Sequence, residues 1–280
     1  FCASINFYHR AHQWNAGRSP ADLHQSFGIS FLRKIKRIYL KYHFCYYKTI
    51  VANFRLLPFR SAIHLPLVIY NKTELKLSRS HIQLNVPSRF GLIKWGYNED
   101  FFVPTKMPSM LFMINGCLII NGPIRVSPGV VFRISGIAEL GKHIEIGGGC
   151  KMLINNDLYI GNQTRFAFGS IICDTNFHYI CDQGIIHRKD GKVIIGNSVW
   201  IGNNCSIVKN AVIPDHAVVS NKSLVNKDFS TYRKAVLLAG SPAKVIKEHC
   251  SHIRSSKLEK EIDKFFKDNK EKTLYKFDMK

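Results

Sequence analysis

Part of the second half of the chain carries an aliphatic residue at every sixth position. The longest unbroken series is Ile195, Ile201, Ile207, Ile213, Val219 and Val225. An α-helix and a two-sided strand have side-chain periods of about 3.6 and 2 residues, so neither produces a repeat of six. A coil with flat sides does, because one short strand and one corner use six residues and return the aliphatic side chain to the interior. Successive rungs then stack about 4.8 Å apart and bury a continuous aliphatic column.

Earlier in the chain the same spacing is found in shorter series, with compact residues at a fixed place in each unit. Leu140 and Ile146 are six apart, and after a small slip Ile160, Phe166 and Ile172 follow at the same interval. The fifth position of the units holds Thr164, Ser170, Val199, Cys205, Ala211, Ala217 and Ser223. The corner of each unit is a tight turn, and Gly, Asn and Asp favour such turns. The sequence therefore predicts an all-β core, a parallel β-helix, over residues 115–245.

These repeats also carry a family resemblance. The units of the form "[I/L/V]-G-x-x-small-x", with "VWIGNNCSI" (199–207) and "LLAGSPAKVIK" (237–247), resemble the hexapeptide-repeat acyltransferases. The resemblance is closest to sugar O-acetyltransferases of the maltose/galactoside type and those acting on surface polysaccharides, and it covers about half of the chain. It implies a left-handed coil with three hexapeptides per turn, an exception to the right-handed crossover rule, assembled as a homotrimer. It also implies acetyl-CoA as the acyl donor, without a metal.

One segment interrupts the repeat. Residues 173–194 leave the six-residue spacing after Ile172 and rejoin it at Ile195. A solenoid is rigid and nearly featureless, so a projecting loop is the natural place for chemistry. We expect this loop to bulge outward, within reach of a neighbouring subunit, with His178 where it departs.

Acyl transfer to a hydroxyl needs a base that works near neutrality, and the ordinary histidine pKa of about 6.5 suits that task. In related enzymes a histidine in such a loop is the general base, which assigns this role to His178; Tyr179 follows it here, where the family often has Pro. Asp174 or Asp182 is expected to orient the imidazole, and Asp182 is also a candidate acceptor contact. A surface histidine without a task is the alternative, and no nucleophilic cysteine is required.

The resemblance also places the acyl donor. Matched motif positions that would contact acetyl-CoA are Asn203, Asn221, Asn226, Lys227 and Lys244. The two lysines are expected to face phosphates; the alternative is that they solubilise the end of the solenoid. Trp200 is expected to line the acceptor or pantetheine pocket, or to pack in the core.

The flanking regions have other patterns. Residues 1–28 form a lead-in without clear periodicity, and 29–57 form a basic helical region without acidic residues. That region fits either an anionic membrane surface or a helix packed on its own protein with a solvated basic face. Residues 58–114 suggest short strands and loops. Residues 246–280 suggest a capping helix followed by a Lys-rich tail.

Composition limits the partners. Forty Lys and Arg residues against 19 Asp and Glu give a net charge of +21, which favours an anionic partner. Nucleic-acid recognition motifs are absent, so nucleic acid is not expected. The eight cysteines form no CxxC pair and indicate reduced thiols in a cytoplasmic protein, peripheral at the inner membrane face if the basic helix binds lipid. No apolar run of about 18 residues predicts a transmembrane helix.

Together these features predict an acetyl-CoA-dependent O-acetyltransferase that acts on a hydroxyl of a sugar or surface glycan. N-acyl transfer to an amino sugar stays open, as does a non-catalytic solenoid that serves as a scaffold or binding module. A metal-dependent enzyme is disfavoured because no pair of ligands accompanies His178 in the repeats.

Overall fold

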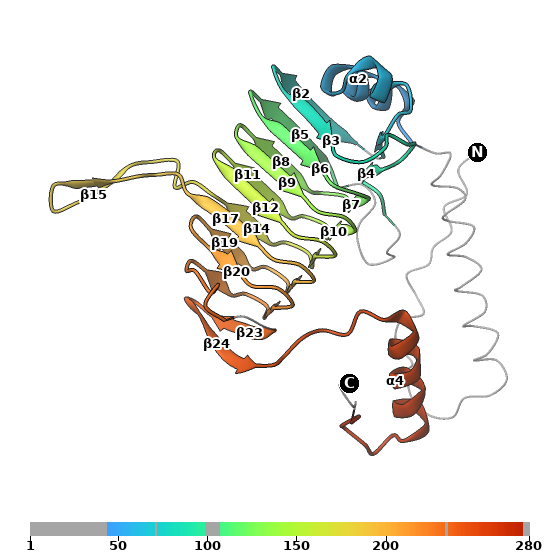
Figure 1. Cartoon of the computed structure of the whole chain (residues 1–280), viewed down its shortest axis with the longest axis vertical. Coiled ribbons are helices and arrows are strands. Elements are labelled where there is room, and N and C mark those ends of the chain that lie inside the picture. The colour runs from blue at the N-terminus through green and yellow to red at the C-terminus, as the bar shows by residue number, and fades with distance from the viewer. Residues whose placement is uncertain (1–43, 71, 99–106, 233–234, 277–280) are drawn as a thin grey trace. The chain divides into compact units, whose positions relative to one another are not determined.

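The computed structural model describes residues 44–70, 72–98, 107–232 and 235–276, and Figure 1 shows strands stacked in a coil. Three parallel sheets form its sides, here called faces A, B and C. The described residues confirm the parallel β-helix expected from the repeats. The chain passes from A to B to C in each turn, so three strands complete one rung.

Face A has nine strands, and its last pair is antiparallel. They are β1 (Leu67–Ile69), β4 (Ile93–Trp95), β7 (Ile124–Val126), β10 (Ile144–Ile146), β13 (Arg165–Phe166), β18 (Trp200–Ile201), β21 (Val218–Val219), β23 (Val236–Gly240) and β24 (Ala243–Glu248). Face B contains β2 (Thr73–Ser78), β5 (Ser109–Ile114), β8 (Val131–Ile134), β11 (Lys151–Ile154), β14 (Ile171–Cys173), β19 (Ser206–Val208) and β22 (Leu224–Val225). Face C contains β3 (His81–Leu84), β6 (Cys117–Ile120), β9 (Ile137–Leu140), β12 (Asp157–Ile160), β17 (Lys192–Ile195) and β20 (Val212–Ile213).

The six-residue spacing becomes a stack of buried side chains. On face C, Ile160 pairs with Ile195, and Ile195 pairs with Ile213 on the next rung. All three are buried, as are the other aliphatic members of the long series. The compact fifth residues are also buried, from Thr164 to Ser223. The core is therefore one aliphatic column that runs through the coil.

Close approach between rungs explains a recurring glycine. A Cβ built on Gly161 would lie 2.6 Å from the carbonyl carbon of Gly196 and 2.7 Å from the nitrogen of Asn197 on the next rung. Real Cβ atoms do not approach backbone so closely. At this corner the two rungs can stack only where the residue after the aliphatic one has no side chain.

The coil begins earlier than residue 115. Strands β1 to β5, which lie within the expected strand and loop region 58–114, belong to the same three faces, and β1 pairs with β4 in parallel. The sequence concealed this because the connection 85–92 between β3 and β4 is longer than a hexapeptide corner. The repeat is structural there, but not periodic in sequence.

Two helices cover the first rung: α2 (Tyr46–Leu56) and α3 (Phe59–Ala62). Asn53 Nδ2 donates to the carbonyl oxygen of Leu67 at 2.6 Å, and the Leu67 amide donates to Asn53 Oδ1 at 3.1 Å. Thr49 Oγ1 accepts from the Ile69 amide at 3.1 Å. Helix α2 thus provides hydrogen-bond partners for the backbone groups at the open edge of β1. Without these partners, the edge could pair with a strand of another chain. Residues 1–43, which include the lead-in and most of the expected basic helix 29–57, lie outside the described residues.

At the other end, β24 pairs antiparallel with β23 and closes face A. Helix α4 (Ser256–Asp268) follows, and Ser255 Oγ accepts from the Leu258 amide at its N-terminus. Its apolar stripe of Leu258, Ile262, Phe265 and Phe266 is half-buried. Among the described residues, no helix is long and apolar enough to cross a membrane.

Candidate active site

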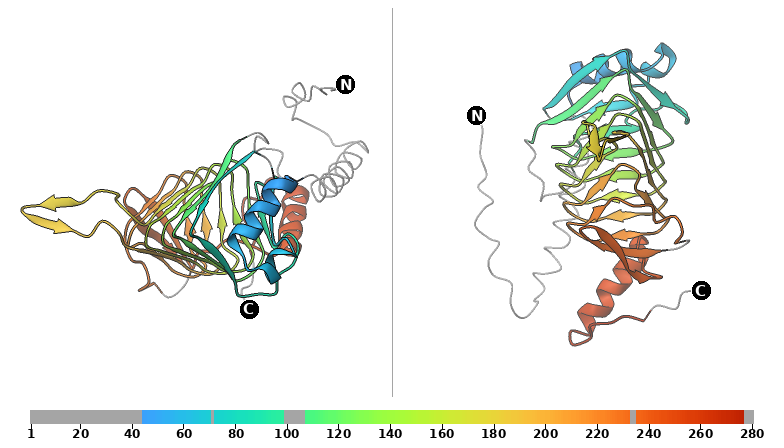
Figure 2. Two further views of the ribbon diagram at one scale, coloured as in Figure 1. Left: turned by 90° about the horizontal axis from the view of Figure 1, so that it is seen from above. Right: turned by 90° about the vertical axis from the view of Figure 1, so that its left-hand side faces the viewer.

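A hairpin projects from the coil where the repeat is interrupted. It consists of β15 (Ile180–Asp182) and β16 (Ile185–His187), and it stands away from the stacked rungs in Figures 1 and 2. It leaves after β14 on face B and returns to β17 on face C. The loop predicted over 173–194 is thus an excursion at the corner between faces B and C.

The base of the hairpin is fastened to the coil. Thr175 and Asp190 form an antiparallel bridge, and the Gly191 amide donates to the Asp174 carbonyl at 2.8 Å. Lys209 Nζ, on the next rung, donates to the carbonyl oxygen of Arg188 at 2.6 Å. The first residues of the excursion therefore have a defined position.

His178 lies at this base and is exposed. Its amide donates to the Asn176 carbonyl at 2.7 Å. Aromatic residues flank it, and each ring lies under a cation: the Arg133 guanidinium is 5.3 Å from the Phe177 ring centroid, and Lys189 Nζ is 5.2 Å from that of Tyr179. The cations thus hold the aromatic rings on both sides of His178, while the His178 imidazole itself faces solvent.

The two aspartates expected to orient His178 are placed differently. Asp174 is fully buried, and its carboxylate accepts from the Asn155 amide at 2.8 Å and the Asn156 amide at 2.7 Å. Burial raises the pKa of Asp174, while these two hydrogen bonds oppose the rise. Asp182 is exposed near the hairpin tip. Within the described residues no hydrogen bond joins either carboxylate to His178, and Asp174 braces the neighbouring corner of face B instead.

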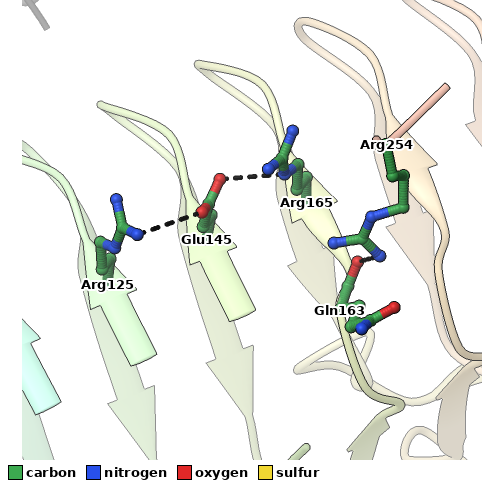
Figure 3. A network of polar contacts seen from close by, with 5 residues as sticks. All are labelled: Arg125, Glu145, Gln163, Arg165 and Arg254. Carbon is green, nitrogen blue, oxygen red and sulfur yellow. Dashed lines mark hydrogen bonds and ion pairs between the residues drawn. The ribbon is translucent and has the colours of Figure 1, made fainter. Parts of the chain in front are cut away.

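A cavity of about 260 Å³ lies on face A. Its lining includes Tyr97, Arg125, Glu145, Arg165 and Trp200. The last four stand in register on successive strands, so they form one outward-facing column. Figure 3 shows Glu145 between two guanidinium groups: Arg165 Nε lies 3.0 Å from Oε2, and Arg125 Nη2 lies 3.8 Å from Oε1.

The segment after β24 passes beside this column. The His252 and Trp200 ring centroids are 6.0 Å apart, and the Arg254 guanidinium donates to the carbonyl oxygen of Gln163, as Figure 3 shows. Trp200 remains 43% exposed, so it is a surface residue and not part of the core. Trp200 also lines the cavity on face A, and its role in an acceptor or pantetheine pocket stays a prediction.

The residues expected at the acyl donor fall at different corners. Asn203 and Asn221 meet at the corner between faces A and B, where the Asn203 amide donates to Asn221 Oδ1 at 2.8 Å. The Asn203 Oδ1 atom is buried and has no hydrogen-bond partner in the described structure. Asn226 and Lys227 are exposed after β22 at the corner between faces B and C, and Lys244 is exposed on β24. The five residues therefore do not form one cluster within a single chain.

His178 and the cavity lie on opposite sides of the coil. The hairpin leaves at the corner between faces B and C, which is the corner opposite face A, and it projects outward from there. One chain alone therefore does not bring His178 to the cavity of Trp200.

Arg125, Glu145 and Arg165 were not among the site residues expected from the sequence. They are 20 residues apart, which is the length of one full turn in that part of the coil. A search at the period of the turn, and not only at the period of the hexapeptide, would have aligned them. His252 and Arg254 carry no such regularity.

The chain has the hexapeptide-repeat β-helix fold. No family model and no curated protein matches the chain. Solved structures that it resembles include the polySia specific acetyltransferase NeuO, with 20% identity, a TM-score of 0.47, and coverage of 71% of this chain and 95% of that one. The polysialic acid O-acetyltransferase OatWY is 19% identical, with a TM-score of 0.37 over 69% of this chain and 96% of that one. A mutant of the N-acyltransferase AntD from Bacillus cereus, in complex with dTDP and coenzyme A, is 17% identical, with a TM-score of 0.40 over 72% of this chain and 89% of that one.

Proposed function

We propose that the protein is an acetyl-CoA-dependent O-acetyltransferase that acts on a hydroxyl of a sugar or surface glycan, with His178 as the general base. One observation carries the proposal: a regular hexapeptide coil is interrupted once in its periodic part, and the interruption holds an exposed histidine at its fastened base. A regular coil needs no such projection for its stability. Acyl transfer is also the chemistry named for NeuO and for AntD, the latter in complex with coenzyme A.

The proposed reaction is direct transfer in a ternary complex. The His178 imidazole accepts the proton of the acceptor hydroxyl as the oxygen attacks the thioester carbonyl. Backbone N–H groups at a coil corner stabilise the tetrahedral oxyanion, and the thiolate of CoA leaves and recovers a proton from the imidazolium. The hydroxyl gains the acetyl group and CoA is released as the free thiol.

We propose that two copies of the chain form each site within a homotrimer. His178 on its projecting hairpin and Trp200 beside its cavity lie on opposite sides of one chain, so a neighbouring copy has to supply one of them. The hairpin also carries exposed apolar side chains, among them Ile185 and Ile186, the latter 67% exposed. Burying such residues against another subunit is favourable by about 25 cal/mol per Å² of apolar area.

Acetyl-CoA is expected at the late rungs. The partnerless Oδ1 of Asn203 is a buried acceptor that lacks a donor in the described structure, and an amide N–H of the pantetheine arm would supply one. Lys227 and Lys244 are exposed and available to phosphates, from whichever copies surround the groove. Asp182 at the hairpin tip is a candidate contact for the acceptor.

The test is CoA release from acetyl-CoA in the presence of a panel of glycans. His178→Ala is expected to lower turnover about 100-fold or more, the usual contribution of a general base. His187→Ala is the matched control, because it removes an exposed histidine from the same hairpin, and it should leave turnover unchanged. Equal activity of the two variants would refute the assignment of His178.

Mass spectrometry and alkali distinguish the remaining alternatives. An O-acetyl ester is cleaved by mild alkaline hydroxylamine, whereas the amide formed by N-acyl transfer to an amino sugar survives it. A scaffold or binding module would release no CoA with any acceptor.

A membrane surface is the proposed further partner. The outer side of α2 and α3 exposes Tyr47, Ile50, Phe54, Phe59 and Ile63, and Arg55 and Arg60 lie among them. Residues 44–70 contain no acidic side chain. Aromatic and aliphatic side chains interleaved with cations suit the headgroup region of an anionic bilayer.

A further inference from the structure

We propose that the cavity on face A binds an acidic saccharide through a carboxylate or phosphate group, so that the acceptor of the proposed reaction is anionic. That the bound saccharide is the acceptor rests on the proposed function. That the cavity binds an acidic saccharide is argued from the charge and shape of the cavity. Three groups that line the cavity carry it: the guanidinium groups of Arg125 and Arg165, and the Glu145 carboxylate between them. The Arg254 guanidinium, which donates to the Gln163 carbonyl, adds a further cation near this column.

The charges stand in one column. Lys94, Arg125, Glu145 and Arg165 occupy equivalent outward positions on four successive strands, and Trp200 occupies the fifth. Neighbouring strands are about 4.8 Å apart, so these side chains are direct neighbours. Of these four described side chains, three are cations and one is a carboxylate, so the described part of the column is positive.

A trough runs beside this column. The residues two positions further along each strand are Ser127, Gly147, Ala167 and Gly202, and the first three line the cavity. These small residues line the bottom of the cavity, and the aromatic rings of Tyr97 and Trp200 line its two ends. Lys94 Nζ lies 4.5 Å from the Tyr97 ring centroid. A floor without bulk, with aromatic and charged walls, is the shape that accepts a sugar ring and its substituents.

Two groups beside the column have lowered pKa values, with burial as the largest cause and the neighbouring cations as the next. Burial is the largest cause that lowers the pKa of His252 to about 4, and the Coulomb effects of Arg254 and Arg165 add to it. Burial and Arg165 likewise lower the pKa of Arg254, and Glu145 offsets this only in part. Like charges brought together at a partly buried surface repel each other, and an anion placed among them would relieve that repulsion.

Guanidinium groups favour this class of ligand. A guanidinium presents two parallel donors that match the two oxygens of a carboxylate or phosphate. Arg165 Nε already lies 3.0 Å from a carboxylate oxygen of Glu145, and the Arg165 side chain remains 41% exposed. A ligand carboxylate can therefore share Arg165 or displace Glu145 from it.

The experiment measures binding without catalysis. A trisaccharide of galacturonic acid and its carboxyl-reduced, neutral counterpart are titrated into the full chain by calorimetry, with coenzyme A as a separate phosphate-bearing probe. Wild type should bind the acid trisaccharide about tenfold or more tightly than the neutral one, a difference of about 1.4 kcal/mol. Arg165→Gln should remove most of that preference, and Arg254→Gln, which removes a nearby cation outside the lining, should reduce it less. Both variants should leave coenzyme A binding unchanged.

Arg60→Gln on α3 is the charge-matched control and should retain the preference, because it removes one exposed cation that does not line the cavity. Equal binding of the acid and neutral trisaccharides by wild type would overturn the inference. Weakened binding of coenzyme A alone in the arginine variants would also overturn it, since the cavity would then hold the donor. A preserved acid preference in a protein that releases no CoA would support this inference while refuting the proposed function.

Discussion

The indole ring of Trp200 and the imidazole ring of His252 lie with their centroids 6.0 Å apart and their planes tilted by 51°. Trp200 stands on β18, and His252 lies on the segment that follows β24, so the contact fastens that segment to face A. Both His252 ring nitrogens are buried and have no hydrogen-bond partner in the described structure. The contact is therefore suited to a neutral imidazole.

This contact should make the protein sensitive to acid. The pKa of His252 falls from the ordinary 6.5 to about 4 in the folded chain, so the unfolded chain binds the proton more readily. The stability that the neutral ring contributes is complete above pH 6.5 and is lost as the pH falls through about 4. His252→Gln should flatten the dependence of the thermal unfolding temperature on pH between about 4 and 6.5.

Fluorescence provides a local measurement of the same event. An imidazolium next to an indole quenches its emission, so Trp200 should dim with a midpoint near pH 4, and Trp200→Phe should remove that transition. A midpoint near the ordinary pKa of 6.5, or the same pH dependence in His252→Gln, would contradict the predicted shift.

Stacking of the rungs predicts a large penalty at Gly161. Alanine there would place its Cβ within 2.7 Å of backbone atoms on the next rung, and neither rung can shift without disturbing the column. We expect Gly161→Ala to destabilise the fold by about 1–3 kcal/mol, the usual cost of overpacking. Chemical unfolding measures the change.

Gly184→Ala in the hairpin is the control for Gly161. A Cβ there meets nothing within 4 Å, so only its φ of +83° carries a cost. An equal loss at both glycines would show that stacking does not explain the glycine of the repeat.

Asp174 should behave as a structural residue. In Asp174→Asn one carboxylate oxygen becomes an amide NH₂ group that faces a backbone donor, either Asn155 N or Asn156 N. One buried donor then lacks an acceptor, which costs about 1–3 kcal/mol, and the unfolding midpoint should fall accordingly. The exposed Asp182→Asn should be silent in the same assay. If Asp174 instead orients His178, its replacement would shift the pH–rate profile at temperatures where the variant is folded.

Periodicity made the coil predictable, because every sixth side chain from Ile195 to Val225 has to be buried for the rungs to stack. It also located the hairpin, since an excursion such as 173–194 is visible only against a regular background. The first rungs, β1 to β5, escaped prediction because their connections vary in length. The alignment of Arg125, Glu145 and Arg165 was not predicted, because the register between turns depends on the length of every corner. A search for the six-residue spacing does not detect those lengths.

The proposed membrane surface makes a prediction for the outer side of α2 and α3. Phe59 is 70% exposed and Ile63 is 52% exposed, and each would enter the headgroup region of a bilayer. Phe59→Ser together with Ile63→Ser should weaken sedimentation with phosphatidylserine vesicles about tenfold, since each buried CH₂ contributes about 0.8 kcal/mol. Ile186→Ser in the hairpin is the matched control. Equal binding to neutral phosphatidylcholine vesicles would refute the role of the cations.

The arrangement of His178 and Trp200 on opposite sides of one chain predicts complementation between inactive variants. His178→Ala retains the cavity of face A, and Trp200→Ala retains the hairpin base. If each site in a cyclic trimer takes the hairpin from one copy and the cavity from the next, random mixing of equal amounts restores about one quarter of the sites. Refolding the two variants together should therefore recover about a quarter of wild-type CoA release, whereas His178→Ala alone retains about a hundredth or less. Recovery no greater than the sum of the separate variants would mean that His178 and Trp200 do not act across an interface.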